Sequence, residues 1–279
     1  GSRSADRGPT PRAFIPLGAE PPAMERVTHD GRETAYRRFD RGGDGPTVCF
    51  VHGSGGTKDV WKSQARIADR FPGVAVDLSG HGDSDDVGTP AGREALDAYA
   101  DDVVAVAEAT DATVLCGNSL GGAVALWVAV ERDLALDGLV LAGTGAKLAV
   151  AEPLRDALAS DFERAVSLLH EPDRLFHDAP VEYVDLSEAA MRACGRAVTE
   201  RDFLTCHRFD VRDRLDAVDV PALALVGAHD GLTPPAYHEY LAEEIRDAEW
   251  TEIPDAAHLA MLERPAAFNE ALAAFLDRL

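Results

Sequence analysis

Near its middle the chain reads Leu115-Cys116-Gly117-Asn118-Ser119-Leu120-Gly121-Gly122, where an apolar run gives way to glycine. Residues 117–121 match the pattern G-x-S-x-G. The apolar run before the serine predicts a buried strand, and the residues after it predict a helix. On such a tight turn, glycines two places away on either side let the strand and the helix approach each other. We therefore predict that Ser119 is a nucleophile, although a glycine-rich turn with an incidental serine gives the same short pattern.

The segments around this turn alternate between predicted strands and predicted helices. Strands are predicted at 25–39 (a hairpin around Asp30-Gly31), 46–51, 73–78, 113–116, 136–142, 222–226 and 250–253. Helices are predicted at 95–110, 120–132, 236–245 and 265–279. Strands that alternate with helices form a parallel sheet covered on both faces. The sequence therefore predicts an α/β fold with a mostly parallel central sheet and helices on both faces.

The alternation lapses between residues 147 and 210. Apolar residues there recur every three or four positions and predict one amphipathic helix: Leu154, Leu158, Phe162, Val166 and Leu169. Thr199 and Asp202 have the spacing of a capping box for another helix. We therefore divide the chain into a flexible tail rich in Pro, Gly and Arg (1–22), a core (23–146 and 211–279) and a helical cap (147–210).

The charge balance argues against several kinds of partner. The 279 residues include 49 acidic and 27 basic side chains, for a net charge of −22, and three of the basic residues are lysine. Such a surface repels duplex nucleic acid and anionic membranes, so we expect neither as a partner. Dispersed carboxylates with few lysines resemble the proteins of salt-accumulating halophiles. The alternative is an ordinary acidic protein.

The four cysteines lie far apart, without a CxxC pair or a Cys/His spacing typical of zinc sites. We therefore expect no zinc site at the cysteines, and the chemistry predicted for Ser119 needs no metal ion or organic cofactor. No run reaches the roughly 18 apolar residues of a membrane-spanning helix. The N-terminal stretch shows no apolar segment bounded by basic residues, and we expect a cytoplasmic protein.

Two further motifs flank predicted strands upstream of the serine. They read His52-Gly53-Ser54-Gly55-Gly56 and Asp77-Leu78-Ser79-Gly80-His81-Gly82-Asp83-Ser84. With the G-x-S-x-G turn they make the chain resemble the α/β-hydrolase family over about residues 25–279. The resemblance implies that the backbone N–H groups of Ser54 and Leu120 form an oxyanion hole. It also implies that His52 orders its loop and that the second motif is structural.

The family resemblance also assigns a base and an acid. His258 lies in a loop before the last predicted helix, in a context similar to the family's histidine loop, with Ala257 where a glycine is common. Asp230 follows the strand at 222–226 in a loop similar to the one that supplies the family's acid. An alternative acid position after residue 142 contains no carboxylate. The order Ser119, Asp230, His258 is that of this fold, and His229 is expected to point away.

Within the family, the chain is most similar to cap-bearing carboxylesterases and enol-lactonases. We therefore expect a serine hydrolase that cleaves small-molecule esters or lactones of small to medium acyl groups. A cofactor-free haloperoxidase or perhydrolase would use the same triad, as would a C–C bond hydrolase, although C–C hydrolases commonly carry Trp where Leu259 follows the base. A non-catalytic small-ligand receptor is the remaining alternative. Five cap residues could meet an acidic substrate or be solvated surface groups: Arg155, Arg164, Arg196, His207 and Arg208. The oligomeric state cannot be predicted from the sequence.

Overall fold

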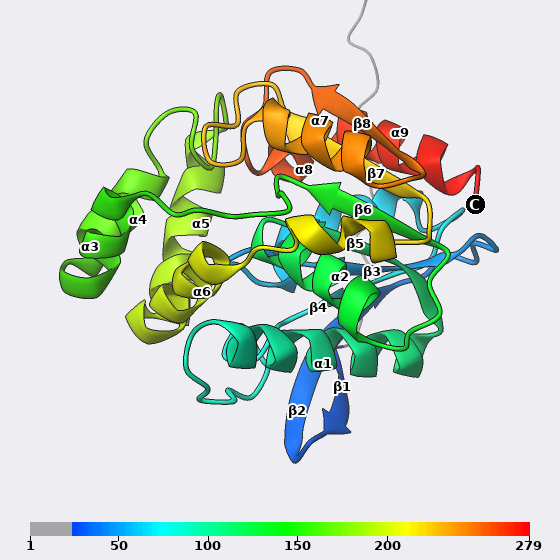
Figure 1. Cartoon of the computed structure of the whole chain (residues 1–279), viewed down its shortest axis with the longest axis horizontal. Coiled ribbons are helices and arrows are strands. Elements are labelled where there is room, and N and C mark those ends of the chain that lie inside the picture. Colours follow the sequence, from blue (N-terminus) through cyan, green and yellow to red (C-terminus); the bar gives the residue numbers. More distant parts are fainter. Residues whose placement is uncertain (1–23) are drawn as a thin grey trace, which may run out of the picture.

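The structure, a computed structural model, describes residues 24–279, and the tail predicted at 1–22 lies outside them. The described residues form an eight-stranded sheet in the order β1-β2-β4-β3-β5-β6-β7-β8 (Figure 1). The strands are β1 (Met24–His29), β2 (Arg32–Phe39), β3 (Thr47–Val51), β4 (Gly73–Val76), β5 (Ala112–Asn118), β6 (Gly138–Ala142), β7 (Ala222–Gly227) and β8 (Ala248–Ile253).

Strand β2 is antiparallel to both β1 and β4, and every other neighbouring pair in the sheet is parallel. The β1–β2 hairpin turns at Asp30 and Gly31, whose φ angles are 46° and 77°. These positive values explain why the Asp-Gly pair marks the turn. The prediction of a mostly parallel sheet is confirmed.

Helices cover both faces of the sheet, as predicted. One face carries α1 (Arg93–Thr110), α2 (Leu120–Glu131), the 3₁₀ segment η2 (Arg212–Ala217) and α7 (Pro235–Glu244). The other carries the 3₁₀ segment η1 (Lys58–Ile67), α8 (Ala260–Glu263) and α9 (Pro265–Leu276). Each layer buries its own apolar core against the sheet, and the large side chains of Tyr99 in the first core and Trp61 in the second are fully buried. None of the helices described is long and apolar enough to cross a membrane.

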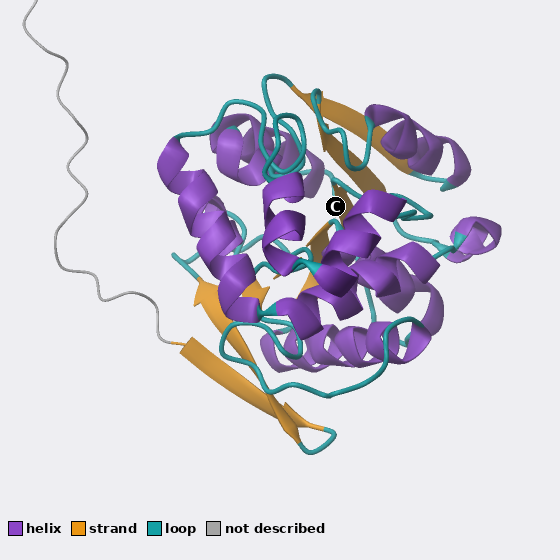
Figure 2. Ribbon diagram, turned by 90° about the vertical axis from the view of Figure 1, so that its left-hand side faces the viewer, coloured by secondary structure: helices purple, strands orange, loops and turns teal. Residues whose placement is uncertain are grey.

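Between β6 and β7 the chain leaves the sheet to form α3 (Glu152–Ser160), α4 (Phe162–Leu169), α5 (Val181–Cys194) and α6 (Arg196–Arg208). Figure 1 shows these helices grouped on one side of the sheet, and Figure 2 shows them in front of the strands. An isolated antiparallel bridge between Lys147 and Asp210 joins the two ends of this segment. We call residues 147–210 the cap, keeping the division predicted from the sequence.

Two details of the cap differ from the sequence predictions. The single helix expected from residue 154 to 169 is broken at Asp161, which ends α3 and whose side chain accepts the N–H of Arg164 to begin α4. This side-chain bond favours a helix start over a helix interior. The capping box is also wrong, because α6 begins after Gly195 and encloses both Thr199 and Asp202. The carboxylate of Asp202 instead binds groups from the core.

Candidate active site

Ser119 lies where β5 turns into α2, in a backbone conformation that L-residues rarely adopt. Its φ and ψ angles are 56° and −116°. The turn requires glycine on both sides. A Cβ added to Gly117 would lie 2.1 Å from the carbonyl oxygen of Gly121, and one added to Gly121 would lie 2.2 Å from the oxygen of Val51. The G-x-S-x-G pattern is therefore explained by close backbone approach, and the strained turn holds Ser119 at the helix N-terminus.

Asp230 and His258 come together as the sequence predicts. The Nδ1 atom of His258 lies 2.9 Å from Oδ2 of Asp230, and both side chains are buried. Asp230 follows β7, and His258 lies in the loop after β8. Because β7 and β8 are parallel neighbours, their carboxyl ends place these two loops side by side.

The carboxylate of Asp230 is held by hydrogen bonds that oppose its burial. Its Oδ1 accepts the N–H groups of Leu232 and Thr233, both at 2.8 Å, and its Oδ2 accepts the hydroxyl of Thr233 at 2.8 Å. Burial raises the pKa of Asp230, but the charge of His258 and the hydrogen bonds from His258 and Thr233 lower it by more, so that the pKa lies below its ordinary value. Asp230 is therefore an anion that can orient an imidazole and stabilise its protonated form.

Ser119 and His258 line the same cavity. The hydrogen bonds among residues 24–279 do not include one between these two side chains, and such bonds are often loose before substrate binds. The side-chain nitrogen of Asn118 ties their loops together by donating to the backbone oxygen of His258 at 3.1 Å. The hydroxyl of Thr144 donates to the backbone oxygen of Ser119 at 2.9 Å. Sequence reasoning missed Asn118 and Thr144, because nothing in their spacing reveals these partners.

The loop that carries Ser54 is ordered by the buried side chain of His52. Its Nε2 atom accepts the N–H of Leu78 at 3.1 Å, which leaves Nδ1 to donate to the backbone oxygen of Gly53 at 2.8 Å. Burial lowers the pKa of His52 to about 4, and the neighbouring His81 contributes to the shift, so the ring is neutral at neutral pH. Leu120, the other expected donor, is the first residue of α2, where helix N–H groups have no intrahelical partner.

A cavity of about 820 Å³ opens between the cap and the core above Ser119 and His258. Its lining is mostly apolar and includes Leu148, Val150, Leu154, Leu169, Met191, Phe203 and Leu232. The charged side chains that line it are Asp59, Lys62, Glu171 and Arg174. None of the five cap residues considered from the sequence as contacts for an acidic substrate lines this cavity.

The cavity also contains a thiol, that of Cys206, whose Sγ lies 3.9 Å from the hydroxyl oxygen of Ser54. Burial raises the pKa of Cys206 to about 12, and the charge of Asp202 adds to this effect. A thiol that stays protonated is a poor nucleophile. Ser119 is therefore the better candidate nucleophile in this cavity.

Comparison with known proteins identifies the family of this chain. The sequence profile of the alpha/beta hydrolase family matches residues 50–271. The 3-oxoadipate enol-lactonase 2 of Acinetobacter baylyi is 27% identical over 252 residues, covering 84% of this chain and 90% of its own. A pimeloyl-[acyl-carrier protein] methyl ester esterase of Neisseria meningitidis is 32% identical over 241 residues, covering 79% of this chain and 90% of its own. The solved structure of a thermophilic esterase has a TM-score of 0.79 at 30% identity, covering 92% of this chain and 98% of its own. The chain belongs to the alpha/beta hydrolase family.

Proposed function

We propose that this protein hydrolyses carboxylic esters or lactones through an acyl-serine intermediate, with Ser119 as nucleophile, His258 as base and Asp230 as acid. The observation that carries the proposal is the placement of the strained Ser119 turn and the Asp230–His258 pair in one cavity. The relatives named above include an enol-lactonase and a methyl ester esterase, which supports the same reaction class.

The mechanism follows from the positions of these groups. Nε2 of His258 takes the hydroxyl proton of Ser119 while Oγ of Ser119 attacks the acyl carbon. The N–H groups of Ser54 and Leu120 stabilise the resulting oxyanion, a contribution of about 3 kcal/mol for one such donor. His258 then passes the proton to the leaving oxygen, which departs as an alcohol or, in a lactone, stays attached to the acyl chain. Water, deprotonated by His258, releases the acid.

The lining of the cavity points to an apolar acyl group. Leucine, valine, methionine and phenylalanine side chains line the same cavity as Ser119, and a volume of about 820 Å³ admits small to medium acyl chains. The four charged side chains of the lining would meet a polar part of the substrate. We propose that the substrate is a small molecule of this kind, and neither a nucleic acid nor a membrane lipid surface.

Active-site labelling combined with a substrate panel tests this function. A fluorophosphonate should label the protein once, on the peptide that contains Ser119, and labelling should abolish hydrolysis of p-nitrophenyl esters of graded acyl length and of matched lactones. Failure to turn over any ester or lactone would refute the proposal. Peracid formation from acetate and peroxide at a higher rate would favour a perhydrolase, and cleavage of vinylogous diketones alone would favour a C–C hydrolase. Binding without any turnover would favour a receptor.

The acidic surface predicts a strong salt response. In residues 24–279 the buried carboxylates are Asp77, Asp102, Asp202, Asp230 and Glu263, so most acidic groups face solvent and repel one another. The Debye length falls from about 10 Å at 0.1 M salt to about 3 Å at 1 M. We expect the melting temperature to rise by about 10 °C or more between 0.1 and 2 M KCl, with a parallel rise in activity. A melting temperature that is constant across this range would rule out halophilic adaptation.

A further inference from the structure

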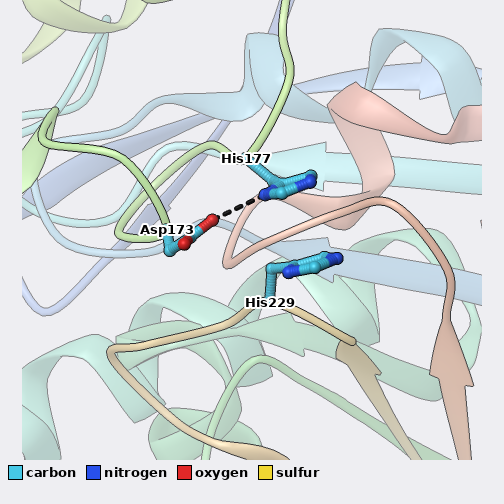
Figure 3. Close-up of side chains that lie close together, drawn as sticks. All are labelled: Asp173, His177 and His229. Atoms are coloured by element: carbon cyan, nitrogen blue, oxygen red, sulfur yellow. Dashed lines mark hydrogen bonds and ion pairs between the residues drawn. The ribbon is translucent and has the colours of Figure 1, made fainter.

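Three side chains that offer metal ligands gather on the surface outside the active site. They are Asp173 and His177 from the cap loop between α4 and α5, and His229 from the loop after β7 (Figure 3). One ligand atom of each lies within 4.8 Å of the others. The Nδ1 atom of His177 is 2.6 Å from Oδ1 of Asp173, and the rings of His177 and His229 stack with their centroids 3.5 Å apart. We propose that these residues bind a divalent transition-metal ion, with Zn²⁺ as the best fit.

The backbone around this cluster is fixed by hydrogen bonds, which favours a preformed site. The N–H of Asp173 donates to Phe176, and the N–H of Gly231 donates to the backbone oxygen of Asp173 at 2.9 Å. The N–H of His177 donates to Oε1 of Glu263, also at 2.9 Å. Asp173 itself has a φ angle of 61°, in the left-handed region, and its carboxylate points toward His177 (Figure 3).

The donor set and the charges suit a transition metal. Two imidazoles and one carboxylate are ligands that Zn²⁺ prefers, whereas Ca²⁺ and Mg²⁺ require mainly oxygen ligands. Tetrahedral ligands about 2.1 Å from zinc lie about 3.4 Å from one another. The lone pairs of the two stacked imidazoles lie in parallel planes, so one ring has to rotate out of the stack before both nitrogens point at the same ion. Asp173 has no Arg or Lys ion-pair partner among residues 24–279. His229 adjoins Asp230, so a bound ion would fasten the cap to the loop that carries the acid.

Zinc titration of the purified, EDTA-treated protein tests this site independently of its hydrolytic activity. Isothermal titration calorimetry with ZnCl₂ should give one saturable site, and H229A and H177A should each weaken it at least tenfold, as expected for loss of a ligand. The matched control is H170A, which removes a cap histidine outside the cluster and should leave affinity unchanged. Zinc should raise the melting temperature of the wild type but not of H229A. No saturable binding at millimolar ZnCl₂, or unaltered affinity in H229A, would overturn the proposal.

A separate group of buried contacts links the cap to the oxyanion loop. Asp202 of α6 is fully buried, and its Oδ2 accepts the N–H of Gly55 at 3.3 Å and a hydrogen bond from Nε2 of His81 at 2.8 Å. Its Oδ1 accepts the hydroxyl of Tyr99 at 2.6 Å. Gly55 directly follows Ser54. We infer that Asp202 is a positioning residue, which holds the oxyanion loop in place from the cap; this inference depends on the proposed function.

The charge of Asp202 explains why a carboxylate is needed at this position. Burial alone would lower the pKa of His81, but the charge of Asp202 and its hydrogen bond raise it well above the ordinary value. The two side chains therefore form a buried ion pair between the core and the cap. Removal of one partner leaves the other charge uncompensated, and the loop at Gly55 loses its acceptor.

The variant D202N tests this role against a matched buried aspartate. Asp102 is equally buried and accepts the backbone N–H and hydroxyl of Ser79, but it does not contact the oxyanion loop. We expect D202N to lower kcat on a p-nitrophenyl ester by about ten- to a hundredfold, less than loss of an oxyanion donor, with KM nearly unchanged. D102N should lower the melting temperature similarly and alter kcat by less than threefold.

If D202N does not fold, Y99F weakens the same anchor while keeping the charge, and a smaller fall in kcat at constant KM is expected. Equal losses of kcat in D202N and D102N, or a change confined to KM, would refute the positioning role. An inactive wild type would instead refute the proposed function, so the experiment distinguishes failure of that function from failure of the positioning role.

Discussion

The variant S119A is expected to lose at least a thousandfold in kcat/KM toward a short-chain p-nitrophenyl ester. Without the hydroxyl no acyl-serine can form, and catalysis falls to what the remaining site can do for direct attack by water. The cavity and the cap should be unaffected, because no hydrogen bond of the described structure uses the Ser119 side chain. The loss should therefore appear in kcat, with a melting temperature close to that of the wild type.

A second serine in the same cavity provides the control. Ser187 lies on α5 and lines the cavity from the cap. Its hydroxyl lies 3.0 Å from Nε2 of His170 and bonds to neither Asp230 nor His258, so S187A should retain kcat/KM within about threefold. If S119A keeps more than about a tenth of wild-type kcat/KM, a loss of less than about 1.4 kcal/mol, Ser119 is not the nucleophile. Labelling of S119A by a fluorophosphonate would lead to the same conclusion.

The strand-to-helix turn could be predicted because its cause is local. Backbone atoms lie too close to Gly117 and Gly121 for any side chain, so both positions require glycine and the sequence shows G-x-S-x-G. The pairing of Asp230 with His258 could be predicted from the order of the loops. The two loops follow parallel neighbouring strands, whose carboxyl ends lie at the same edge of the sheet. The sequence alone was therefore enough to predict that Ser119, Asp230 and His258 lie in one region.

The contacts of the cap could not be predicted in the same way. The spacing of Thr199 and Asp202 matches a capping box, yet Asp202 bonds to Tyr99 and His81, which come from distant segments. The apolar repeat of residues 154–169 spans the helix break at Asp161. The periodicity of one apolar face therefore could not predict this break, which depends on the side-chain hydrogen bond that begins α4. Likewise, His177 and His229 have no recognisable metal-site spacing, and their proximity arises only when the cap folds onto the core.

The variant G121A is expected to lose both stability and activity, because its effect reaches two parts of the site. The new Cβ would overlap the backbone oxygens of Val51 and His52, at 2.2 and 2.7 Å, at the end of β3. Neither backbone group can rotate away, so α2 must withdraw from β3. That shift would move Ser119 relative to the loop of Ser54, and misplacement by about 1 Å can cost a hundredfold in rate.

Urea unfolding and ester kinetics together measure these effects. Overpacking of this kind should lower the free energy of unfolding by about 3 kcal/mol or more. Gly88 serves as the comparison, because its φ angle is +62° and no atom lies within 4 Å of an added Cβ. G88A should therefore lower the free energy of unfolding only by the backbone strain, about 1 kcal/mol, and should leave kcat unchanged. If G121A is no less stable than G88A and retains its kcat, then the close approach of α2 to β3 is not what places the nucleophile beside its oxyanion loop.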